Sequence, residues 1–74
     1  MTPQDLAWNQ DTESAEVQLS QGEMLRIYRS SNGSFCMYHF DAEFETIRRA
    51  SGMPWEVIVD YINMVRGEGV VNDK

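Results

Sequence analysis

The chain has 74 residues, a formal net charge of −6 and an apolar content of 42%. At this length it holds one small domain at most, and its apolar content favours a folded chain over a disordered one. We find no apolar stretch long enough to span a bilayer and no basic-plus-apolar leader, so we expect a cytoplasmic protein with no membrane partner. A single cysteine, Cys36, and a single histidine, His39, exclude an internal disulfide and a structural zinc site.

The acidic residues are concentrated near the N-terminus. Residues 1–24 carry five acids and no Lys or Arg, whereas residues 25–74 carry seven acids against six cations. One interpretation is a solvated acidic surface that keeps the protein soluble, and another is an acidic strip that binds a basic partner. Repulsion from phosphates makes nucleic acid an unexpected partner.

In chain order, the first forty residues predict a short helix followed by strands. Thr2-Pro3-Gln4-Asp5 is typical of a helix start, and residues 9–14 form a polar linker. Residues 15–20 alternate between apolar and polar side chains, and residues 23–29 and 34–40 are rich in β-branched, aromatic and Met residues. We therefore expect a three-stranded antiparallel meander.

The last two predicted strands are separated by a hairpin signal, Asn32-Gly33. A two-residue loop at this position places Tyr28 opposite Met37 and Arg26 opposite His39. Both faces of the sheet are then substantially apolar. One carries Leu25, Ile27, Cys36, Tyr38 and Phe40, and the other carries Met24, Tyr28, Phe35 and Met37.

Two further helices are expected after the sheet. Asp41 is a good N-cap for a helix over residues 42–51, in which Phe44 and Ile47 form one inward-facing stripe. Gly52-Met53-Pro54 ends that helix, and Pro54 opens a second one running to about Arg66. The predicted fold is therefore α+β, with a short N-terminal helix, a three-stranded antiparallel meander and two C-terminal helices. Residues 1–14 form an acidic N-terminal segment, and residues 15–74 form a single domain.

This arrangement carries more apolar surface than a small domain can bury. Two helices can cover one face of the sheet, and nothing obvious covers the other. We expect the uncovered surface to contact a second copy of the chain or a different protein. The alternative is that the N-terminal segment with Leu6 and Trp8 folds back as the missing cover.

Residues 44–71 resemble the helix-turn-helix of winged-helix DNA-binding regulators. The matching positions are Ile47, Gly52, Met53-Pro54, Ile58, Ile62, Val65 and Gly69-Val70-Val71. The resemblance implies two helices crossing at a steep angle through a glycine turn, and a transcriptional regulator or excisionase-like factor acting as a dimer. Glu56 and Asp60 would face DNA phosphates in that arrangement, so this function is the alternative.

Catalysis is not expected. Cys36 and His39 are three residues apart and point to opposite faces of a strand, so they cannot form a nucleophile–base pair. His39 lies close to Asp41 in the sequence and could be oriented by it. No glycine-rich phosphate loop or metal-ligand set is present in the sequence, so neither a cofactor nor a metal is expected.

The favoured function is that of a non-enzymatic inhibitor or adaptor that occludes a surface of another protein. Small, acidic, apolar-faced chains are similar in type to the host-blocking proteins of phages and mobile elements, including anti-CRISPR proteins. The target would be a protein with a basic surface, such as a component of a nucleic-acid-handling complex. The expected contact residues are Trp55, Glu56, Val59, Asp60, Tyr61, Tyr28 and Phe35.

Overall fold

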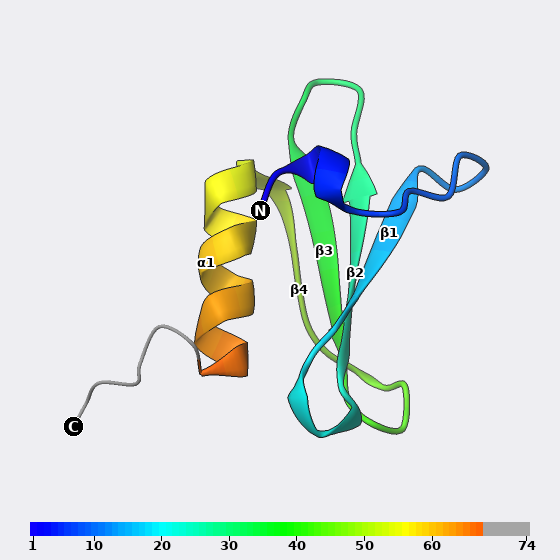
Figure 1. The fold of residues 1–74 in the computed structure, drawn as a ribbon. Coiled ribbons are helices and arrows are strands. Elements are labelled where there is room, and N and C mark those ends of the chain that lie inside the picture. The colour runs from blue at the N-terminus through cyan, green and yellow to red at the C-terminus, as the bar shows by residue number, and fades with distance from the viewer. Residues whose placement is uncertain (68–74) are drawn as a thin grey trace.

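The computed structural model describes residues 1–67 as a four-stranded antiparallel sheet with one α-helix beside it (Figure 1). The strands follow one another in sheet order as β1–β2–β3–β4. Their bounds are β1 (Ser14–Gln18), β2 (Met24–Arg29), β3 (Phe35–Phe40) and β4 (Thr46–Met53), and the helix is α1 (Trp55–Arg66). Two short 3₁₀ turns, η1 (Pro3–Asp5) and η2 (Ser20–Gly22), precede β1 and β2. The closing segment 69–71 of the helix-turn-helix resemblance lies outside the described residues.

The expected helix over residues 42–51 is wrong, and so is the prediction of three strands followed by two helices. These residues form the β3–β4 connection and most of β4. Asp41 Oδ1 does accept backbone N–H groups, from Glu43 at 2.9 Å and Glu45 at 3.0 Å, but it closes a tight loop rather than capping a helix. Phe44 has a φ of 63°, which no right-handed helix allows.

β4 is longer than its neighbour because it contains two bulges. β3 has six residues and β4 has eight, and the pairing shifts between His39 and Phe40 and again between Phe35 and Met37. The second shift lies beside Gly52, whose φ of 67° is readily adopted only without a side chain. The bulges interrupt the period-two pattern, which removes the usual sequence signal of a strand.

The β2–β3 hairpin has a longer loop than expected. Residues 30–34 form a five-residue connection in which Asn32 Oδ1 accepts hydrogen bonds from the Ser34 amide at 3.1 Å and from the Ser30 hydroxyl at 2.6 Å. Tyr28 consequently pairs with Cys36 rather than Met37. The register differs from the predicted one by one residue, which exchanges the faces that β2 and β3 share.

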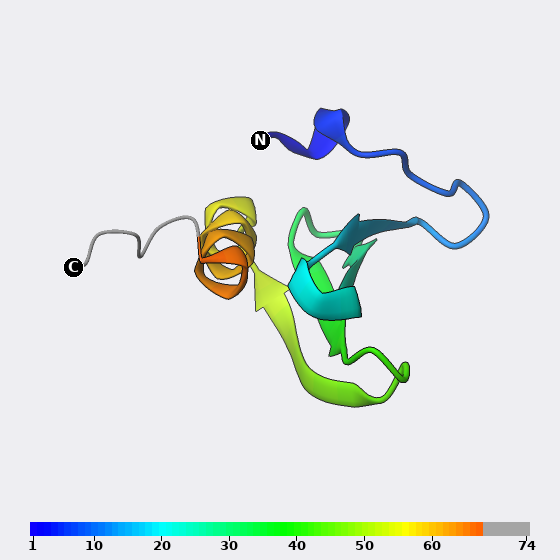
Figure 2. The same ribbon diagram turned by 60° about the horizontal axis from the view of Figure 1, so that its bottom comes forward.

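With this register, one sheet face forms the core and packs against α1. The largest fully buried side chains come from β2, β3 and α1, and they are Leu25, Ile27, Met37, Ile58 and Ile62. Figure 2 shows α1 on one side of the sheet and the β3–β4 loop projecting away from the helix. We call the sheet face that packs on α1 the inner face and the opposite one the outer face.

The N-terminal segment packs against the same core as α1. Thr2 N–H donates to Asp5 Oδ2 at 2.8 Å within the η1 turn, and Trp8 Nε1–H donates to the Pro3 carbonyl at 2.7 Å. Leu6 and Trp8 are half-buried against the core cluster, and the Trp8 ring lies 6.3 Å from the ring of Phe35. The segment therefore folds back, as one alternative anticipated, but onto the inner face.

α1 has the ends that its sequence predicts. Pro54 is its N-cap residue, and Gly67 ends it in the left-handed conformation with a φ of 79°. Arg66 reaches from the last turn to the Gln18 carbonyl at 2.7 Å, and Trp55 Nε1–H donates to the Met1 carbonyl at 2.9 Å. Both ends of the helix are thereby joined to the sheet layer and the N-terminal segment. No helix among residues 1–67 is both long and apolar enough to cross a membrane.

Candidate functional site

The outward side of α1 presents two apolar residues next to two acids. Val57 is 42% exposed and Met64 is 55% exposed, and they lie seven residues apart, which places them on the same side of the helix. Glu56 and Asp60 are exposed on the adjoining stripe. We call these four residues the helix surface.

The acids of the helix surface are unpaired within residues 1–67, where Glu16 forms an ion pair with Arg26 and Glu23 is hydrogen-bonded to His39. The arginines, by contrast, are mostly held by internal contacts. Arg29 lies 4.1 Å from the Trp8 ring centroid and Arg48 lies 5.9 Å from that of Tyr61. The exposed carboxylates thus give the protein a surface that is electrostatically suited to cations.

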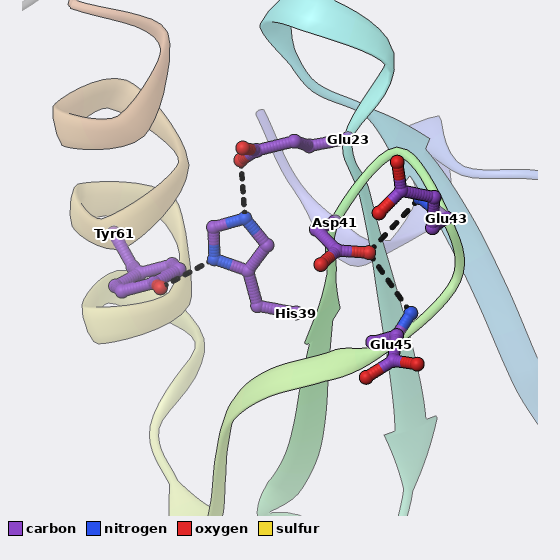
Figure 3. Close-up of polar contacts among 6 residues, drawn as sticks. All are labelled: Glu23, His39, Asp41, Glu43, Glu45 and Tyr61. Atoms are coloured by element: carbon purple, nitrogen blue, oxygen red, sulfur yellow. Dashed lines mark hydrogen bonds and ion pairs between the residues drawn. The ribbon is translucent and has the colours of Figure 1, made fainter.

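A second feature is a buried polar network between the sheet and α1. His39 is 5% exposed, its Nδ1 lies 2.7 Å from the Tyr61 hydroxyl, and its Nε2 lies 2.7 Å from Glu23 Oε1 (Figure 3). Burial raises the pKa of Tyr61; Arg48 opposes this and Glu23 adds to it. Tyr61 is therefore neutral at physiological pH, and its hydroxyl serves as a hydrogen-bonding partner for the imidazole.

The partners of His39 differ from the expected one. Asp41 accepts hydrogen bonds from the loop amides in Figure 3 and does not orient the imidazole. Cys36 lies on the outer face and His39 on the inner face, so the structure does not bring a thiol to this base. Within residues 1–67, no group of three or more His, Cys, Asp and Glu side chains could hold a metal ion.

A third feature is the aromatic outer face of the sheet. The Tyr38 ring lies 5.7 Å from that of Tyr28 in an edge-to-face arrangement and 6.4 Å from the ring of Phe40 in a stacked one. The Arg26 guanidinium lies 5.4 Å from the Phe40 ring centroid and is bonded to Glu16 Oε2 at 2.7 Å. The bonded Glu16 carboxylate, and after it the neighbouring Tyr28 hydroxyl, raises the pKa of Arg26.

The expected contact residues are divided among these features. Glu56 and Asp60 are exposed on α1, and Val59 is half-buried beside them. Trp55 is half-buried, with its ring 5.0 Å from that of Phe35.

Two aromatic residues of the expected contact set are engaged elsewhere. Tyr61 is half-buried in the network with His39. Phe35 is 8% exposed in the core, so it is not available to a partner. Tyr28 lies on the outer face, away from the helix surface.

Several exposed apolar residues were absent from the expected set. Phe44 is 72% exposed and Ile47 is 53% exposed, although both were expected to face inward from a helix. Val57 and Met64 could have been found from the helical period alone, since they share a side with Asp60. Tyr38 and Phe40 required the correct strand register.

Comparisons with known proteins give no relatives. No protein-family description matches the chain, and neither a curated protein nor a solved structure matches it at a significant level.

Proposed function

We propose that this protein binds the basic surface of another protein through the helix surface of α1 and acts as a small, non-enzymatic inhibitor or adaptor. The supporting observation is the juxtaposition on one helix side of exposed Val57 and Met64 with the unpaired carboxylates of Glu56 and Asp60. Val59 is half-buried beside the two acids and extends this surface at its margin. Trp55 and Tyr61 are half-buried against Phe35 and His39.

The two kinds of residue have different roles in such a contact. Burial of Val57 and Met64 would provide the hydrophobic part of the binding free energy, about 25 cal/mol per Å² of apolar surface. Glu56 and Asp60 would pair with Lys or Arg of the partner and would mainly accelerate encounter and select the orientation. A partner whose basic surface normally binds nucleic acid would then be inhibited, because the carboxylates would occupy the positions of phosphates.

The helix-turn-helix alternative is not proposed, because the first of its two helices is β4. The helix that would enter a DNA groove is α1, and its outward side carries Glu56 and Asp60. Carboxylates at those positions would face the phosphate backbone without compensation.

The test has two stages, identification of the partner and measurement of its affinity. Tagged protein is used to capture binders from its native cell, and the captured protein is then purified for calorimetry with the wild-type chain. Asp60→Lys should weaken binding by about tenfold or more, because it places a cation against a basic surface. Met64→Ser should also weaken it by several-fold, since an exposed side chain can be changed without disturbing the core.

The matched control is Glu43→Lys, which makes the same charge change in the β3–β4 loop, away from α1. This variant should bind with nearly the wild-type affinity at physiological salt, where charges beyond about 8 Å are screened. If Asp60→Lys and Met64→Ser bind as tightly as the wild type, the helix surface is not the contact. If Glu43→Lys weakens binding equally, only net charge matters.

A further inference from the structure

The outer face of the sheet is a second surface that the proposed function does not use. It points away from α1 and carries the half-buried side chains of Tyr28, Tyr38 and Phe40. Among residues 1–67 no helix lies over this face (Figure 2), and partly exposed aromatic residues on such a face are typical of a surface that is covered by another molecule. The order of charges on this face indicates which molecule it fits.

The strand pairing places four side chains in one row across the outer face. Glu16 of β1 is paired with Arg26 of β2, Arg26 with Tyr38 of β3, and Tyr38 with Arg49 of β4. Directly paired residues of antiparallel strands share a face, so the row begins with an acid at one edge of the sheet and ends with a cation at the other. No ion pair joins Arg49 to another residue within 1–67.

This row is complementary to itself under one particular symmetry. A two-fold axis parallel to the strands, between two outer faces, places β1 opposite β4 of the second copy and β2 opposite its β3. The Glu16 carboxylate, which is already bonded to Arg26 of its own chain, then also meets Arg49 of the second copy, and Arg26 meets the Tyr38 ring. An axis through this row and across the strands would instead place Glu16 on Glu16 and Arg26 on Arg26, which like-charge repulsion disfavours.

We propose that two copies of this chain associate through their outer faces about a two-fold axis parallel to the strands. Beside Arg49 there is a hollow of about 290 Å³ lined by Cys36, Tyr38, Arg49, Ala50 and Ser51, which gives space for the Glu16 carboxylate of the second copy. The same contact brings the aromatic side chains of the two faces together and removes them from water.

The size of the face sets the strength of the association. Four strands about 4.8 Å apart and about six residues long give a projected area of roughly 300 Å². Because a stable interface buries about 800 Å² per partner, the dimer is expected to be weak, with a Kd on the order of 10 to 100 μM. The helix surface remains exposed in this dimer, so both copies can bind the partner of the proposed function.

The test reverses the charge at each end of the row, in two separate variants. Glu16→Arg and Arg49→Glu should each raise the dimer Kd by about tenfold or more, measured by sedimentation equilibrium. An equimolar mixture of the two variants should associate with about the wild-type affinity. In the mixed dimer, the arginine introduced at position 16 faces the glutamate introduced at position 49, and the unchanged Glu16 faces the unchanged Arg49.

The controls make the same charge changes elsewhere. Glu43→Arg lies in the β3–β4 loop, and Arg48→Glu is next to Arg49 but pairs with His39 on the inner face; both should dimerise as the wild type does. Circular dichroism shows whether every variant is folded. A wild-type chain that stays monomeric at about 1 mM would overturn the proposal. Folded variants that self-associate as the wild type does, or whose mixture fails to associate, would also overturn it.

Discussion

His39 and Tyr61 are joined by a hydrogen bond of 2.7 Å between Nδ1 and the phenolic hydroxyl, across the boundary between β3 and α1. The imidazole is 5% exposed, and its second nitrogen is bonded to Glu23 just before β2. Both ring nitrogens of His39 therefore have hydrogen-bond partners, one on α1 and one in the segment before β2. Because α1 otherwise packs through Ile58 and Ile62, this network adds directional contacts to an apolar interface.

Removal of the Tyr61 hydroxyl should destabilise the protein. Tyr61→Phe leaves one nitrogen of the buried imidazole without its partner, which costs about 1–2 kcal/mol in the free energy of unfolding. For a domain of this size, that corresponds to a fall in Tm of roughly 4–16 °C. Urea denaturation at neutral pH measures the difference.

Tyr38→Phe is the matched control for that variant. The Tyr38 hydroxyl makes no hydrogen bond to another described residue, so its loss should change the free energy of unfolding by less than about 0.5 kcal/mol. If the two variants lose the same stability, the His39–Tyr61 bond makes no specific contribution to the fold.

Alkaline pH should destabilise the protein partly through Tyr61. Burial raises the pKa of this hydroxyl above its ordinary value of 10.0, so between the two pKa values the folded state keeps a proton that the unfolded state releases. The contribution is fully present below the unfolded pKa and is lost as pH rises through the folded pKa. Urea denaturation from pH 8 to about 11 should show that the free energy of unfolding falls more steeply in the wild type than in Tyr61→Phe.

If the free energy of unfolding falls equally steeply in the wild type and in Tyr61→Phe over that pH range, Tyr61 does not contribute to the alkaline loss of stability. The comparison with Tyr61→Phe is needed because Tyr28 and Tyr38 are common to both proteins. Contributions that the two proteins share cancel in the difference between their two stability curves.

The β3–β4 loop provides a direct test of the fold. Phe44 is 72% exposed and has a φ of 63°, a conformation that a bulky side chain tolerates poorly. Phe44→Asn should raise the free energy of unfolding by about 0.5–1 kcal/mol, because asparagine adopts this conformation at lower cost and little burial is lost. In the helix that the sequence predicts, the same change would remove an inward-facing ring and cost about 3 kcal/mol or more.

Asp41 closes a loop although its sequence context predicts a helix start, and the reason is physical. A carboxylate that accepts backbone N–H groups two to four residues later occurs both at helix starts and in tight loops, and the residue type does not distinguish them. The apolar residues Phe44 and Ile47, spaced as on a helix face, then favoured the helix. The two bulges of β4 removed the alternation that would have indicated a strand.

The predicted register of the β2–β3 hairpin was wrong for a different reason, and this had a larger effect on the site. Asn32-Gly33 correctly marks a turn, but the serines on either side bond to Asn32 and extend the loop to five residues. A shift of one residue between β2 and β3 then moved Phe35 out of the expected binding surface and into the same core as Ile27. The α1 acids, which depend on no strand register, were placed on the surface correctly.

The N-terminal segment should be part of the folded unit although its composition resembles a linker. The Trp8 ring contacts Phe35 and carries the Arg29 guanidinium 4.1 Å from its centroid, and its Nε1–H is bonded to the Pro3 carbonyl. Trp8→Ala should therefore lower the free energy of unfolding by about 2 kcal/mol, less than for a fully buried tryptophan because Trp8 is half-buried. Gln10→Ala, a change of an exposed residue two positions further on, should have an effect below about 0.5 kcal/mol. Equal stability of Trp8→Ala and the wild type would mean that residues 15–67 fold without this contact, and that the acidic segment is only appended to them.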